Sequence, residues 1–229
     1  MMVERTFQNI REGKLGSADQ QSFLVSLGWS SGTTWEGLLR SKRVLMISEA
    51  GAGKTYECRK QAQRLWDAGE PAFFVELAAL ASMDLRSMLD DDEEARLDVW
   101  LSSQSDMATF FLDSIDELKL SRGSFEQSLK RLKKVIGSQL GRVRIIITTR
   151  PIPFDQQLVR RLLPIPPPPS REPSEETFAN IAMGDHQNQQ AGDKDDEETA
   201  DWRTVALMPL SDAQIVEFAK VQGVEDPVV

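Results

Sequence analysis

A glycine-rich turn between an apolar run and a helical pattern is the feature that most constrains this chain. A phosphate-binding loop requires this order, and here the apolar run Val44–Ile47 precedes Ser48-Glu49-Ala50-Gly51-Ala52-Gly53-Lys54-Thr55. In such a loop backbone N–H groups point at an anion, the lysine reaches the β- and γ-phosphates, and the threonine hydroxyl ligates Mg²⁺. Ser48 stands where the full pattern has glycine. The pattern predicts a nucleotide site at residues 48–55; the alternative is a glycine-rich turn without a ligand.

Composition narrows the class of protein. The chain has 229 residues, a net charge of −9 and one cysteine, Cys58. The acidic balance argues against a general attraction to nucleic acid or anionic membranes. Neither an N-terminal apolar signal nor a run of the ~18 apolar residues of a membrane span is present. We therefore expect a soluble, cytoplasmic protein with its thiol reduced.

Apolar strand patterns alternate with helical patterns from the phosphate loop onward, which is typical of an α/β fold with a parallel sheet. The expected strands are 44–47, 72–77, 109–112, 143–148 and 204–208. We expect four regions: an N-terminal helical segment (1–40), a P-loop NTPase core (41–163), a Pro-rich and acidic mobile insertion (164–201), and the fifth strand with the start of a helical region (202–229).

Two polar segments within the core carry local predictions. Ser124 and Gln127 have the spacing of a capping box, so we expect a helix to begin there. The acidic run Asp90–Glu94 interrupts helical patterns and is interpreted as a solvated face, because consecutive carboxylates are usually surface residues.

A second carboxylate site must accompany a phosphate loop that binds Mg²⁺. The strand 109–112 ends in Asp113, which would lie beside the Mg²⁺ held by Thr55. Asp116 and Glu117 follow and can polarise an attacking water. The alternative is that Asp113 only ends a strand and that Asp116 and Glu117 open a surface turn.

Three segments together resemble the NACHT branch of the STAND NTPases: Glu49–Thr55, Phe111–Leu118 and Ile146–Pro151. The specific part is the spacing of Asp113 from the pair Asp116 and Glu117. The resemblance covers roughly residues 43–222. It implies a three-layer P-loop NTPase sandwich with five parallel strands in the order 5-1-4-3-2, ATP or ADP with Mg²⁺ as cofactors, and Arg150 as the residue that senses the γ-phosphate.

The resemblance also implies a biological role. Members of this family are molecular switches that exchange ADP for ATP and self-associate, and many bacterial members serve antiphage defence. We therefore expect a slow ATPase that is the N-terminal part of a larger protein or a reduced version of one. A P-loop kinase and a non-hydrolysing nucleotide-binding interaction module stay open as alternatives, whereas a GTPase is disfavoured because no Asn-Lys-x-Asp segment occurs.

Overall fold

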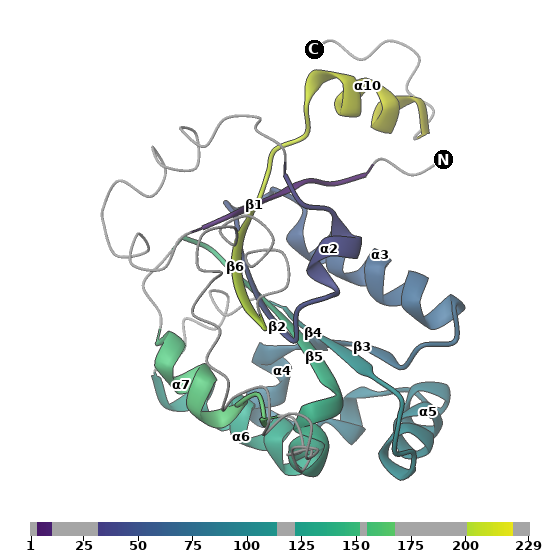
Figure 1. The fold of residues 1–229 in the computed structure, drawn as a ribbon, viewed down its shortest axis with the longest axis vertical. Helices are drawn as coiled ribbons and strands as arrows, with labels where there is room; N and C mark the ends of the chain where they lie inside the picture. Colours follow the sequence, from purple (N-terminus) through teal and green to yellow (C-terminus); the bar gives the residue numbers. More distant parts are fainter. Residues whose placement is uncertain (1–3, 11–31, 114–121, 152–154, 168–200, 222–229) are drawn as a thin grey trace, which may run out of the picture.

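The computed structural model describes residues 4–10, 32–113, 122–151, 155–167 and 201–221 (Figure 1). The strands are β1 (Phe7–Asn9), β2 (Arg43–Ile47), β3 (Ala72–Glu76), β4 (Ala108–Asp113), β5 (Val143–Thr149) and β6 (Trp202–Leu207). The helices are α2 (Trp35–Leu38), α3 (Lys54–Asp67), α4 (Leu77–Ser82), α5 (Asp91–Ser102), α6 (Arg122–Ile136), α7 (Gln156–Leu162) and α10 (Asp212–Val221), with the 3₁₀ helices η1 (Arg86–Met88) and η2 (Gly137–Arg142). None of the helices in these ranges is long and apolar enough to cross a membrane.

The six strands form one sheet in the order β1-β6-β2-β5-β4-β3. Strands β2 to β6 run parallel, and β1 pairs antiparallel with β6. The predicted α/β class is confirmed, but the strand count and the full order differ from the predicted five strands in the order 5-1-4-3-2. The difference is β1, which lies inside the segment 1–40 where we expected only helices. The parallel strands follow one another as β6-β2-β5-β4-β3.

Helices cover both faces of the sheet, so the molecule has three layers (Figure 1). Alternate residues of each strand point to opposite faces. Val44 and Met46 pack in a cluster with α2 and α3, whereas Leu45 and Ile47 pack in a larger cluster with α4, α5, α6 and α7. Cys58 on α3 is fully buried in the first cluster.

The helix starts add to one local prediction and correct another. Asp90, Asp91 and Asp92 are exposed, as predicted for a solvated face. Asp90 is the N-cap of α5: its side chain accepts a hydrogen bond from the Glu93 N–H, and the Glu93 side chain accepts one from the Asp90 N–H. Part of the acidic run is therefore a capping box rather than only a solvated face, because unpaired N–H groups at a helix start favour carboxylates. Helix α6 begins at Arg122, before the predicted cap at Ser124.

Arg43 at the start of β2 is the most deeply buried charged side chain of the described strands. Its side chain is 1% exposed, and burial lowers its pKa to about 10. The guanidinium donates to the backbone carbonyls of Lys42, Leu140, Val143, Leu163 and Pro164. Leu140 lies in η2, Val143 begins β5, and Leu163 and Pro164 directly follow α7. Arg43 therefore joins these three segments at the end of β2 that lies away from the glycine-rich loop.

Candidate functional site

The glycine-rich segment connects the end of β2 to the start of α3. Its entry is tied to the neighbouring strand, because the Ser48 N–H donates to the Thr149 carbonyl at 3.1 Å. Gly51 and Gly53 have φ angles of 76° and 90°. Residues with a Cβ rarely adopt this left-handed region, so glycine is needed at both positions. The local backbone is therefore the bent loop that the sequence pattern predicted.

Lys54 closes the loop from the helix side. Its ammonium donates to the carbonyls of Ser48 at 2.8 Å and Glu49 at 3.0 Å, and the side chain is 8% exposed. The N–H groups in the first turn of α3 have no partner within the helix, and the helix dipole adds a partial positive charge there. A lysine and a helix N-terminus thus share one small region, which is suited to an anion such as a phosphate.

Two buried polar atoms of the loop lack a described hydrogen-bond partner. The Ser48 Oγ and the Glu49 Oε1 have no hydrogen-bond partner among the described residues. Buried polar atoms in native proteins nearly always bind a protein group, water or a ligand. At the position where the motif has glycine, Ser48 thus adds a buried hydroxyl without a described hydrogen-bond partner.

Asp113 connects the loop to two other elements. Its Oδ2 accepts a hydrogen bond from the Thr55 hydroxyl at 2.7 Å, and its Oδ1 accepts one from the Thr148 hydroxyl at 2.6 Å. Asp113 and Thr148 are 5% and 0% exposed, whereas Thr55 lies open to solvent. The carboxyl ends of β4 and β5 and the first turn of α3 thus place three oxygen-bearing side chains together. Hydroxyl and carboxylate oxygens are ligands of Mg²⁺.

Arg150 directly follows β5, and β5 pairs with β2 on one side and with β4 on the other. This places Arg150 between the strand that leads into the loop and the strand that ends in Asp113, as the resemblance implied. Its side chain is exposed. Asp116 and Glu117, the predicted residues for activating water, lie outside the described residues.

Sequence reasoning missed two residues of this region. Arg5 donates to the carbonyls of Ala52 at 3.2 Å and Met208 at 2.8 Å, and so attaches the N-terminal segment to the loop. Burial lowers the pKa of Arg5, and the nearby Glu57 opposes that shift. Arg5 stands in no motif, so no pattern could have identified it. Thr148 did carry a signal in the sequence, because it is a polar residue directly after the apolar run Ile145–Ile147 of β5.

Two other chemistries find little support in this region. Burial, followed by the negative charges of Asp113 and Glu57, raises the pKa of the Cys58 thiol well above 9.0, so this thiol is a poor nucleophile. Within the described ranges, no three His, Cys, Asp or Glu side chains converge as metal ligands. A Mg²⁺ ion held by few protein oxygens and by phosphates does not need such a cluster.

The chain has little detectable similarity to known proteins. No protein-family model and no curated protein matches the sequence. The solved structures that match include a chain from the structure of a DnaB-like replicative helicase and its interactions with primase. The TM-score is 0.27 at 10% identity, over 52% of this chain and 43% of the helicase chain. This similarity is too low to assign a family or a function.

Proposed function

We propose that the chain binds a nucleoside triphosphate with Mg²⁺ at residues 48–55 and acts as a regulatory NTPase module. The observation that carries the proposal is the hydrogen bond between the Thr55 hydroxyl and Asp113. A glycine-rich turn alone has structural explanations. A turn whose threonine meets the carboxylate at the end of a neighbouring parallel strand has the parts that a Mg²⁺–phosphate site needs.

Each part of the site has a role in this proposal. The loop N–H groups and the Lys54 ammonium hold the phosphates, and the oxygens of Thr55 and Asp113 hold Mg²⁺ directly or through water. Thr148 keeps the Asp113 carboxylate oriented. Bound Mg²⁺ neutralises charge on the phosphate oxygens.

Hydrolysis and switching are further steps of the proposal. Asp116 and Glu117 are the candidates for orienting and deprotonating water, and Arg150 for sensing the γ-phosphate. The resemblance to NACHT proteins supports ATP or ADP as the nucleotide, slow turnover, self-association and a part in bacterial antiphage signalling. A slow NTPase suits a switch, because the lifetime of its triphosphate state sets the duration of its signal.

Calorimetric titration with ATP and Mg²⁺ tests the binding step. Lys54→Ala is expected to abolish measurable binding, since a charge-assisted phosphate contact is lost. Lys42→Ala is the matched control, because Lys42 precedes the opposite end of β2 and forms a partly exposed ion pair with Asp201. Unchanged affinity in Lys54→Ala, or an equal loss in both variants, would refute the proposed site.

A further inference from the structure

The outer edge of β3 exposes backbone groups that no described strand pairs with, because β3 ends the sheet order. Ala72 is opposite Thr109 in the parallel register, and the Thr109 N–H donates to the Pro71 carbonyl at 2.8 Å. In this register Phe73 directs its N–H and C=O groups toward β4. The N–H and C=O groups of Ala72 and Phe74 therefore point away from the sheet.

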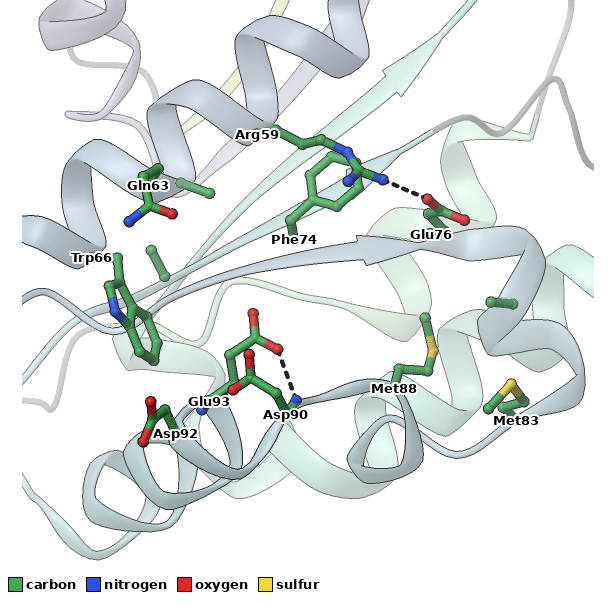
Figure 2. Close-up of a pocket in the computed structure, with 13 residues that line it drawn as sticks. Arg59, Gln63, Trp66, Phe74, Glu76, Met83, Met88, Asp90, Asp92 and Glu93 are labelled. Atoms are coloured by element: carbon green, nitrogen blue, oxygen red, sulfur yellow. Dashed lines mark hydrogen bonds and ion pairs between the residues drawn. The ribbon is translucent and has the colours of Figure 1, made fainter.

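A groove lies along this edge (Figure 2). Its volume is about 620 Å³, enough for several residues of an extended chain. One wall comes from α3, with Arg59 and Trp66, and the opposite wall comes from the segment between α4 and α5, with Met83 and Met88. Phe74 forms part of the floor, and Met83 is 44% exposed. The groove thus combines an open strand edge with apolar surface.

The charges around the groove are unevenly distributed. Asp90, Asp92 and Glu93 lie on the α5 side, as Figure 2 shows. On the α3 side the Arg59 guanidinium is 4.4 Å from the centre of the Phe74 ring and is paired with Glu76 at 2.7 Å. The α5 side therefore has three carboxylates in the groove against a nearby cation, Arg96, whose guanidinium is 3.5 Å from the centre of the Trp66 ring. The charges on the α3 side are balanced. Burial raises the pKa of the Glu93 carboxyl, and the hydrogen bond from the Asp90 N–H opposes that shift.

We propose that this groove binds an extended segment of a partner protein as an additional strand, and that the segment alternates apolar residues with lysine or arginine. Side chains of an added strand point alternately toward the two faces of the sheet. One set would face the acidic α5 side and the other would pack on Phe74 and Trp66. The free backbone groups supply the pairing, and the charges select the partner.

Exposed strand edges in natural proteins are usually blocked by charged side chains, proline or a covering element. Here Pro71 precedes the strand and Glu76 ends it, whereas Ala72 and Phe74 between them have no charge of their own. The edge is thus left open at the positions where the groove is lined by apolar side chains, which is what strand addition requires.

A peptide titration tests the proposal on the full chain. The probe is a fluorescein-labelled peptide of alternating valine and lysine, about ten residues long, used below the concentration at which it self-associates. We expect saturable binding in fluorescence anisotropy. Hydrogen exchange followed by NMR should show new protection of the Ala72 and Phe74 amides, while the Phe73 amide, which already pairs with β4, does not change.

Two substitutions form a matched pair. Asp91 and Asp92 are both exposed in the first turn of α5, but only Asp92 lines the groove. Asp92→Lys is expected to weaken peptide binding about fivefold or more, and Asp91→Lys less than about twofold. Ala72→Pro removes one outward N–H at a strand position that tolerates proline, and should also weaken binding.

Three results would overturn the proposal. One is the absence of new protection at the Ala72 and Phe74 amides when peptide is present. The second is equal binding of a peptide in which glutamate replaces lysine. The third is a dimer in sedimentation experiments that the peptide dissociates, because the groove would then be occupied by a second copy of this chain. The tests do not use nucleotide, so they are independent of the proposed function.

Discussion

Replacing Thr148 with valine isolates the hydrogen bond that orients Asp113. The Thr148 hydroxyl donates to Oδ1 of Asp113 at 2.6 Å, and both residues are buried. Valine has nearly the same shape but no donor, so the carboxylate oxygen loses this partner in a region that water reaches poorly. A hydrogen bond to a charged group contributes about 1.5–3 kcal/mol, and an unsatisfied buried group costs a similar amount. We expect Thr148→Val to lower the free energy of unfolding by about 1.5–3 kcal/mol.

Thr204 supplies the control for this prediction. It is 6% exposed on β6, and its hydroxyl has no hydrogen-bond partner among the described residues. Thr204→Val makes the same chemical change in the same sheet without breaking a described hydrogen bond. We expect it to be neutral or stabilising, because the buried hydroxyl is replaced by a methyl group. Urea denaturation followed by tryptophan fluorescence measures both variants, with unchanged m-values as the sign that only stability differs.

The same variant has a functional readout. Loss of a residue that hydrogen-bonds to a metal-binding carboxylate typically lowers metal affinity by about 10- to 100-fold. Thr148→Val should therefore weaken ATP binding about tenfold with Mg²⁺ present and change it little in EDTA. The reasoning fails if the free energy of unfolding of Thr148→Val lies within about 0.5 kcal/mol of the wild-type value. It also fails if Thr204→Val lowers the free energy of unfolding by as much as Thr148→Val does.

Three further predictions concern the stability of the fold. Arg43→Met should cost about 3–5 kcal/mol in urea denaturation, because buried carbonyls lose their donor, whereas the exposed Arg40→Met should cost less than about 0.5 kcal/mol; equal costs would contradict the role of Arg43. Gly53→Ala should cost about 1–2 kcal/mol because φ is 90°, while Gly137→Ala, where φ is not left-handed and the nearest atom to an added Cβ is 3.5 Å away, should be close to neutral. Arg86 holds the pKa of the exposed Asp98 below 3.8, so this pair stabilises the folded state above that pH and loses its contribution as the pH falls. Asp98→Asn should therefore be less stable than the wild type at pH 7, and this difference should shrink as the pH falls below 3.8; a difference that does not shrink would contradict the ion pair.

The parallel core of the fold was predictable because its strands are continuous apolar runs. Residues such as those of β5 are buried on both faces, and the glycine-rich turn fixes where β2 ends. β1 was missed because it has three residues, which is too short for a periodic pattern. Its position depends on pairing with β6, about 200 residues away in the chain. Local sequence cannot contain that information.

The candidate site was predictable only where its residues are close together in the sequence or end an apolar strand. The glycine-rich loop is contiguous, so the spacing of Gly51, Gly53 and Lys54 is visible in the sequence. Asp113 could be identified because it ends an apolar strand. The contact of Asp113 with Thr148 depends on β4 and β5 being neighbours, which the sequence shows only through the resemblance. The contact of Arg5 with the loop depends on β1, so missing that strand also meant missing the arginine.

The contacts of the loop also bear on how tightly it can bind a phosphate. The Lys54 ammonium donates to the carbonyls of Ser48 and Glu49, so a phosphate must compete with these carbonyls for its donors. The affinity for a phosphate would therefore be the difference between the new contacts and those that are lost. Arg5 donates to Ala52 and Met208 from outside the loop, and these bonds do not involve the lysine. Holding the loop backbone from outside lowers the entropy lost on binding. Because Arg5 holds the loop backbone at Ala52, the Lys54 ammonium can exchange the carbonyls of Ser48 and Glu49 for a phosphate without refolding of the loop.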